Sequence, residues 1–70
     1  MAIHECKKAP WGVYRVCDVF RSSRGEEIAL CQDWDGYFEL PARTVRHHRN
    51  LSEDEYARRR EAEIRRAFEN

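Results

Sequence analysis

Hydrophobic and polar residues alternate through the first half of the chain and then change to a helical spacing. Residues 11–20 are rich in β-branched and aromatic side chains, and residues 26–34 and 37–40 continue the strand-like pattern. The dipeptide Asp35-Gly36 between the last two runs is typical of a two-residue hairpin turn. The alternation within 11–20 is imperfect, which predicts a β-bulge or burial on both faces. The first half therefore predicts a three-stranded antiparallel meander.

The second half begins at Pro41, which cannot donate to a strand ladder and so ends the third strand. Residues 45–48 add a short fourth strand if they pair with the sheet, so we expect three or four strands. A helix is predicted over residues 53–68, because Ser52 and Glu55 form a capping box at its start. Leu51 and Tyr56 also occupy the positions of a hydrophobic staple.

The predicted helix is amphipathic. Its apolar stripe consists of Tyr56, Ala57, Ile64, Ala67 and Phe68. Its charged side carries three acid-before-base pairs four residues apart, which are Asp54–Arg58, Glu55–Arg59 and Glu61–Arg65. Residues 1–70 are therefore predicted to form a single α+β domain, a three- or four-stranded antiparallel bent sheet followed by one C-terminal amphipathic helix.

The length and the cysteines restrict the class of protein. Seventy residues allow one small domain with a thin core, and such domains need an additional stabilising element. The three cysteines cannot all pair, and the N-terminus lacks a continuous apolar run, so we expect reduced thiols in the cytoplasm. No apolar stretch approaches the roughly 20 residues that cross a bilayer, so no membrane partner is expected. A homodimer is the expected stabilising element.

The charges balance overall but are unevenly distributed. The chain has 13 basic and 13 acidic side chains, yet residues 21–40 sum to −3 and residues 41–50 to +3. A neutral chain disfavours a nucleic-acid binder, whereas the local basic segment favours one. The alternative is an edge strand whose charges keep it unpaired. The candidate nucleic-acid contacts are Arg43, Arg46, His47, His48 and Arg49.

The residues do not predict catalysis, a metal site or a cofactor. The possible metal donors are His4, Cys6, Cys17, Cys31, His47 and His48. None of the cysteines forms a C-x-x-C pair, and two of them lie inside predicted strands, where a buried inert thiol is the usual state. The glycines are isolated, so no phosphate-binding loop is expected, and a thin sheet under one helix offers little concavity for a substrate. We therefore expect a non-catalytic protein.

The segment Gly36-Tyr37-Phe38-Glu39-Leu40-Pro41-Ala42-Arg43-Thr44-Val45 resembles the end of an SH3-like small β-barrel. In such barrels a glycine-led aromatic strand runs into a proline-started turn and a final valine-bearing strand. The resemblance implies a small, strongly bent SH3-like sheet. It does not imply peptide recognition, because the aromatic ligand-binding cluster of SH3 domains has no counterpart here. In general character the chain also resembles short accessory proteins of phages and mobile elements, including anti-CRISPR inhibitors.

The many aromatic residues point to binding. Core positions are predicted for Tyr14, Phe20, Phe38 and Phe68. The predicted function is to bind and modulate another macromolecule, most plainly as an inhibitor of a host protein or a nucleoprotein complex such as a CRISPR complex. The predicted contacts are Trp34, Tyr37, Arg43 and Arg46, with Glu26, Glu27, Asp33 and Asp35 for a basic partner surface. The alternatives are a nucleic-acid-binding regulator that uses residues 43–49 and a self-assembling structural subunit.

Overall fold

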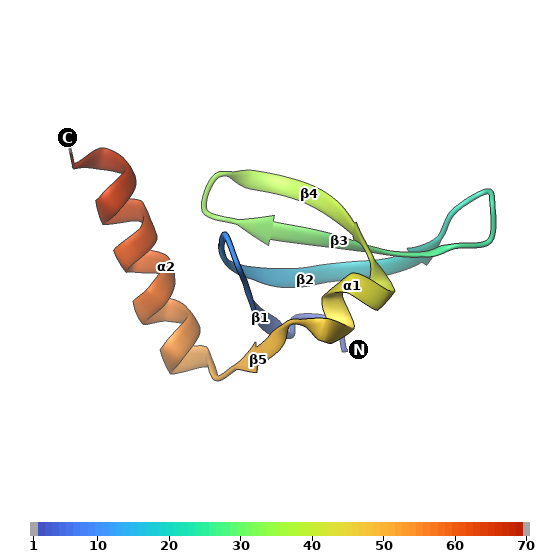
Figure 1. Ribbon diagram of the computed structural model, residues 1–70, viewed down its shortest axis with the longest axis horizontal. Coiled ribbons are helices and arrows are strands. Elements are labelled where there is room, and N and C mark those ends of the chain that lie inside the picture. The colour runs from blue at the N-terminus through green and yellow to red at the C-terminus, as the bar shows by residue number, and fades with distance from the viewer. Residues whose placement is uncertain (1, 70) are drawn as a thin grey trace.

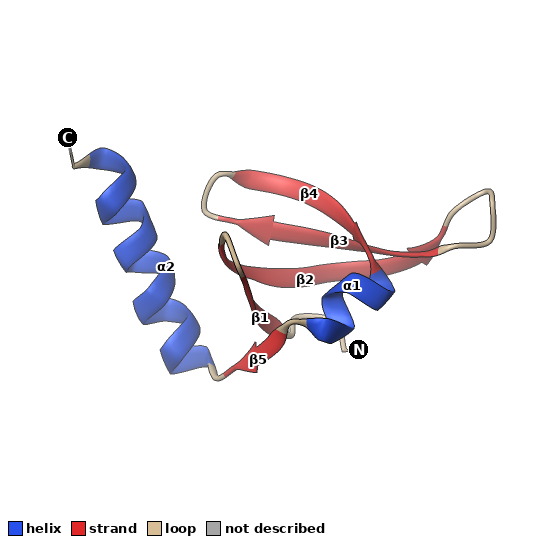
Figure 2. Ribbon diagram, viewed as in Figure 1, coloured by secondary structure: helices blue, strands red, loops and turns tan. Residues whose placement is uncertain are grey.

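One antiparallel sheet of five strands is the centre of the fold. The computed structural model describes residues 2–69. The elements in chain order are β1 (Cys6–Ala9), β2 (Gly12–Arg21), β3 (Glu27–Asp33), β4 (Gly36–Pro41), α1 (Ala42–His47), β5 (Arg49–Leu51) and α2 (Glu53–Phe68). The strand order is β4-β3-β2-β1-β5 (Figures 1 and 2). The predicted α+β class and antiparallel sheet followed by a helix are confirmed, with one strand more than the three or four expected.

A bulge in β2 explains the imperfect alternation of its sequence. Val16 pairs with Cys31 but Asp18 pairs with Leu30, so Cys17 is the extra residue. The side chains on one face are therefore Tyr14 and Val16 before the bulge and Val19 after it. Of the two alternatives that the sequence left open, the structure has the bulge.

The two faces of the sheet carry different neighbours. We name them after the helix that packs on each. On the α1 face the core consists of Ala9, Tyr14, Val16, Ala29, Cys31 and Val45, with Val19, Phe38 and Leu40 against it. On the α2 face a smaller cluster consists of Cys6, Val13 and Tyr56, with Leu51 against it. Both helices are thus needed to bury what this short chain can bury.

Two of the four predicted core aromatics lie elsewhere. Tyr14 is fully buried and Phe38 packs beside it, as expected. Phe20 shares sequence parity with Tyr14, but the bulge between them moves it to the α2 face, where it is 38% exposed. Phe68 is 78% exposed, because it lies in the last turn of α2, beyond the cluster around Tyr56.

The predicted strand over residues 45–48 is wrong. Residues 42–47 form α1 instead, with Ala42 and Val45 buried. These two residues are three apart, so a helix places both on one face, whereas a strand would point them to opposite faces. The next strand is β5, which pairs with β1 at Cys6 and Leu51.

The first strand, β1, was not expected from the sequence. Its residues are Cys-Lys-Lys-Ala, and the lysine pair gives it a polar appearance. Lys7 is nonetheless buried. Its ammonium group donates to the carbonyl oxygen of His48 at 3.3 Å and lies 3.7 Å from the carboxylate of Glu5. These polar partners allow a charged residue in the interior.

The hairpin between β3 and β4 has a different turn from the predicted one. Asp33 pairs with Gly36, so the central residues are Trp34 and Asp35. Neither has a positive φ, and only Gly36 does, at 143°. The Asp33 carboxylate closes the turn by accepting the backbone amides of Asp35 at 2.8 Å and Gly36 at 3.0 Å.

The helix α2 has the predicted bounds. The Ser52 hydroxyl accepts the backbone amide of Glu55 at 3.1 Å, as the capping box requires. The Glu55 carboxylate does not return the contact but binds Arg49 and Arg59. The predicted pairs Glu55–Arg59 and Glu61–Arg65 are ion pairs, whereas Arg58 donates to the backbone oxygen of Asp54. Within residues 2–69, neither helix combines the length and apolar character that a membrane span requires.

Candidate binding surfaces

The eight predicted partner contacts form two separate groups at opposite ends of β3. Glu26, Glu27, Arg43 and Arg46 line a small hollow where β3 begins and α1 packs. Asp33, Trp34, Asp35 and Tyr37 lie at the turn where β3 ends. Because β3 covers seven residues, about 20 Å separates the two groups at roughly 3.3 Å per residue. They do not form one contact surface.

In the first group the predicted charges pair with one another. Arg46 forms an ion pair with Glu27. Arg43 and Glu26 are exposed and, among the described residues, have no ion-pair partner. Sequence reasoning could not detect this pairing, since 19 positions separate Arg46 from Glu27. The group therefore presents little net charge to a partner.

In the second group only part of the surface is available. The Trp34 ring packs against Phe68 of α2, with ring centroids 6.2 Å apart. Asp33 closes the hairpin turn, as described above. Tyr37 and Asp35 remain exposed. Tyr37 lies opposite Gln32 in the β3–β4 register and so projects from the α2 face.

The predicted nucleic-acid segment does not form a continuous basic surface. Three of its members, Arg43, Arg46 and His47, lie on α1, and Arg49 lies on β5. Arg46 is paired with Glu27, and Arg49 contacts Glu55 at 3.2 Å. The ring of His48 is half-buried and hydrogen-bonded to the hydroxyl group of Tyr14. Of the five residues predicted to contact nucleic acid, only Arg43 and His47 are exposed and lack an ion-pair partner within residues 2–69.

The α2 face carries an apolar patch that sequence reasoning missed. Its members are Phe20, Ile28, Leu30 and Pro41, and we call this set the sheet patch. Phe20 pairs with Ile28 and Ile28 pairs with Pro41, so these side chains stand side by side. Leu30 has Asp18 and Glu39 as its two cross-strand neighbours, which gives the patch an acidic rim. The signal in the sequence was the bulge, which turns Phe20 to this side.

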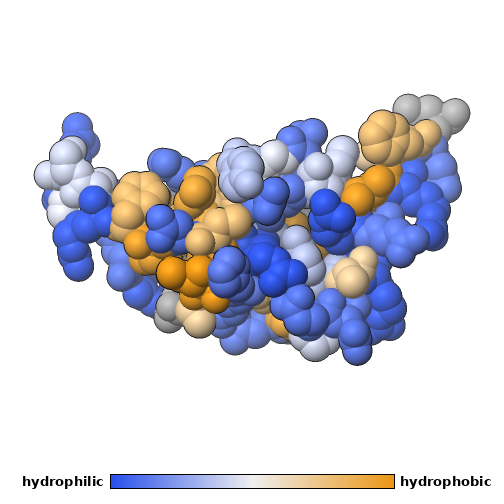
Figure 3. Space-filling model, turned by 180° about the vertical axis from the view of Figure 1, so that it is seen from behind, coloured by the Kyte–Doolittle hydropathy of each residue, from blue (hydrophilic) through white to orange (hydrophobic). Residues whose placement is uncertain are grey.

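The helix α2 contributes a second apolar area beside the same face. Ala57, Ile64 and Phe68, which we call the helix stripe, recur on one side of α2. Figure 3 shows apolar side chains in two areas of one face of the molecule, one over the sheet and one near the end of the chain. Among the described residues of α2, only Tyr56 is buried. The helix therefore leaves most of its stripe uncovered.

A groove of about 560 Å³ separates α2 from the sheet. Arg15 forms its floor and holds both oxygens of Glu53, at 3.0 and 2.8 Å. The same guanidinium group lies 4.9 Å from the centre of the Tyr56 ring, a cation–π distance. These contacts fix the angle between helix and sheet and neutralise the charge of Arg15.

The buried cysteines are not arranged as nucleophiles. Burial, reinforced by the hydrogen bond from its thiol to Glu53 at 3.2 Å, raises the pKa of Cys6 to about 11. Burial and the neighbouring Cys17 raise the pKa of Cys31 to about 11. Both thiols are therefore protonated near pH 7, and it is the thiolate that reacts. Within residues 2–69 no three His, Cys, Asp or Glu side chains are grouped to hold a metal ion.

His48 makes the stability depend on pH. Burial, together with the charges of Lys7, His47 and Lys8, lowers its pKa below the ordinary 6.5, and its Nδ1 forms a hydrogen bond with the Tyr14 hydroxyl at 2.6 Å. The unfolded chain then binds a proton more readily, so stability rises with pH across this range and falls on acidification below about pH 6.5. Urea unfolding at pH 7.5 and pH 5.5, chosen about one pH unit on either side of 6.5, should show a lower midpoint at the acid value.

The exposed neighbouring residue His47 provides the control for this prediction. His48→Asn should remove most of the acid destabilisation, while His47→Asn should keep it. Equal midpoints for the unsubstituted protein at the two pH values would contradict the assignment.

Comparison of the chain with protein-family models, with curated proteins and with solved structures gives no match. The functional proposal therefore rests on the residues of this chain and on their geometry.

Proposed function

We propose that this protein is a non-catalytic binding module that docks a protein partner on its α2 face. The observation that carries the proposal is the sheet patch, formed by neighbouring side chains of β2, β3 and β4 and left uncovered by α2. Small soluble domains rarely expose adjoining apolar side chains without a partner for them, and patches of this kind mark interaction sites.

The chemistry of the face indicates the kind of partner. Asp18 and Glu39 stand on either side of Leu30, and Arg15, which lies nearby, is neutralised by Glu53. The rim is therefore acidic around an apolar centre. A protein surface with an apolar anchor and basic residues around it complements such a face.

The shape of the face supports the same proposal. The groove between α2 and the sheet has Ile64 on its helix wall and Gln32 on its sheet wall. The exposed Phe68 and Tyr37 extend the face at its end, and aromatic residues are enriched in binding hot spots. Inhibition of a host factor, which the resemblance to phage accessory proteins implies, requires only such a surface.

Leu30→Arg should weaken partner binding at least about tenfold, because it places a charge at the centre of the patch. The new side chain lies between Asp18 and Glu39, which favours folding. The partner is first captured from a bacterial lysate treated with nuclease and identified by mass spectrometry. Its affinity for each purified variant is then measured by calorimetry.

Ile3→Arg is the matched control, since Ile3 is an exposed apolar residue of the N-terminal segment. It should bind the partner with unchanged affinity. A folded Leu30→Arg variant that binds as well as Ile3→Arg would refute the proposed docking face. Light scattering of the purified protein shows in the same experiment whether a second copy is the partner.

A further inference from the structure

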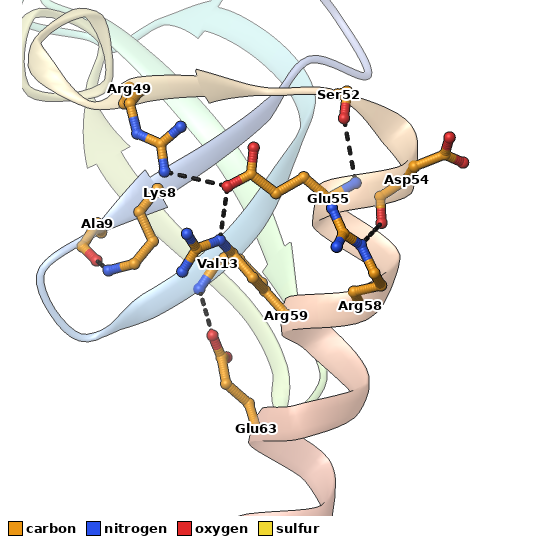
Figure 4. A network of polar contacts seen from close by, with 10 residues as sticks. All are labelled: Lys8, Ala9, Val13, Arg49, Ser52, Asp54, Glu55, Arg58, Arg59 and Glu63. Atoms are coloured by element: carbon orange, nitrogen blue, oxygen red, sulfur yellow. Dashed lines mark hydrogen bonds and ion pairs between the residues drawn. The ribbon is translucent and has the colours of Figure 1, made fainter.

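A basic hollow lies on the flank of α2 opposite the helix stripe. Its cations are Lys8 from β1 and Arg59 and Arg66 from α2, and Trp11 stands on its rim. The hollow has a volume of about 250 Å³. Figure 4 shows the side chains of Arg49 and Arg59 meeting at the Glu55 carboxylate, and the Lys8 side chain beside them with its ammonium group at the carbonyl oxygen of Ala9. None of the residues that line the hollow belongs to the predicted basic segment 43–49.

The cations in and beside this hollow outnumber their partners. Lys8 and Arg49 are directly opposite in the β1–β5 register, an arrangement in which like charges repel. Arg49 and Arg59 share a single oxygen of Glu55, at 3.2 and 2.8 Å. The Lys8 ammonium group donates to the carbonyl oxygen of Ala9. One carboxylate therefore serves two guanidinium groups and leaves the ammonium group without a counter-ion among the described residues.

The acid that lines the hollow, Glu63, is occupied by a backbone amide. Glu63 accepts the amide of Val13 at 2.9 Å. Its carboxylate is so close to Gly12 that a Cβ atom there would lie 2.7 Å from one oxygen. With Lys8, Arg49, Arg59 and Arg66 set against Glu55 and Glu63, four positive charges face two negative ones, a net of +2. An anion would relieve the repulsion.

Trp11 supplies a rigid aromatic surface at the rim. Its ring stacks on Tyr14, with centroids 6.3 Å apart and planes inclined by 13°, and meets the edge of His48 at 5.5 Å. It is nevertheless 56% exposed. The ring also borders a second hollow with Arg66. A tryptophan that is held on one side and open on the other can stack a flat ligand with little loss of side-chain entropy.

We propose that this basic hollow binds single-stranded nucleic acid, with a backbone phosphate among Lys8, Arg59 and Arg66 and an adjacent base stacked on Trp11. Cations beside an exposed aromatic ring are the combination that single strands recognise, because phosphate and base are contacted together. A duplex keeps its bases stacked inside and offers none to Trp11. The site is separate from the sheet patch, so it adds a second binding activity to the proposed protein docking.

The test measures binding of a fluorescein-labelled 12-nucleotide oligo-dT by anisotropy at 50 mM salt. Trp11→Ala should weaken binding about 5- to 150-fold, the range for loss of one stacked base. Trp11→Phe should restore most of the affinity, which a merely structural role would not require. Arg58→Gln, at an exposed arginine outside the hollow, should have no effect.

The salt dependence tests the phosphate contact. Contacts from three cations predict a slope of log K against log salt of about −2, at roughly −0.7 for each contact on a single strand. Affinity should then fall about 16- to 20-fold from 50 to 200 mM salt. Arg66→Gln should make the slope less steep by about 0.7.

Several results would overturn the proposal. They are equal binding by the folded Trp11→Ala variant, an unchanged slope in Arg66→Gln, tighter binding of a 12-base-pair duplex, or full competition by millimolar inorganic phosphate alone. Circular dichroism shows which variants fold. If Trp11→Ala does not fold, Arg66→Gln and the duplex comparison decide the outcome. If a variant loses oligonucleotide binding but still captures the protein partner, the proposed docking face is unaffected. The two proposals can therefore be refuted independently.

Discussion

Tyr14→Ala is expected to destabilise the protein by about 3–5 kcal/mol, the range for removal of a buried aromatic side chain. Tyr14 is completely buried at the centre of the α1 face. Its ring meets Phe38 edge-on at 5.5 Å and His48 at 5.6 Å, and it stacks beneath Trp11. Alanine removes all of these contacts and leaves a cavity that the sheet cannot close.

This loss is large compared with the total free energy of unfolding of so small a domain. A core of this size rarely supplies more than about 3–5 kcal/mol. Tyr14→Ala should therefore be largely unfolded at 25 °C, with circular dichroism that lacks the sheet signal and no cooperative urea transition.

Tyr14→Phe provides the control. It keeps the ring and removes only the hydroxyl group that is hydrogen-bonded to His48 Nδ1 at 2.6 Å. Loss of one such hydrogen bond costs about 1 kcal/mol, so this variant should unfold cooperatively at a slightly lower urea concentration. If the free energies of unfolding of Tyr14→Ala and the unsubstituted protein agreed within about 1 kcal/mol, the packing described here would be wrong.

Gly12→Ala is expected to destabilise the protein by about 2–4 kcal/mol. Gly12 has a φ of 154°, a conformation that residues with a side chain rarely adopt. The added Cβ would also lie 2.7 Å from an oxygen of Glu63. The Glu63 carboxylate must then shift, which disturbs its hydrogen bond with the backbone amide of Val13, a contact between α2 and the first turn of the sheet.

Gly36→Ala separates the two causes. Gly36 has a similar φ of 143°, but nothing lies within 4 Å of the Cβ it would gain. This variant carries the backbone strain alone, about 1–3 kcal/mol. Urea unfolding should rank Gly12→Ala below Gly36→Ala, and hydrogen exchange should show faster exchange in α2 for Gly12→Ala only. If the two variants had equal free energies of unfolding, the contact with Glu63 would contribute nothing to the destabilisation by Gly12→Ala.

The elements predicted correctly are those with local signals. The bounds of α2 agree with the prediction, because Ser52 and Glu55 are three residues apart and cap the helix through neighbouring atoms. The strands over 11–20, 26–34 and 37–40 agree with β2, β3 and β4 within about two residues, the usual uncertainty at element ends. The bulge at Cys17 could also be expected, since it disturbs the alternation directly.

The elements missed are those whose form depends on distant partners. The strand β1 holds a buried Lys7, whose ammonium group is satisfied by His48, 41 positions away. The segment 42–47 became α1 rather than part of a strand because Ala42 and Val45 fill the space over β3 and β4. The local sequence pattern reveals neither the partner of Lys7 nor the strands on which α1 packs.

By itself the sequence determined the α+β class, the central meander and the C-terminal helix, since propensity, capping and alternation act over a few residues. Only the tertiary structure decided which charges remain available. Arg46 is neutralised by Glu27, whereas Lys8 of β1 comes together beside Trp11 with Arg59 and Arg66 of α2. It also decided that Phe20 and Leu30 lie on the α2 face and stay at least partly exposed. The reason is physical: burial and ion pairing depend on distances in space, and strand register and helix docking set those distances.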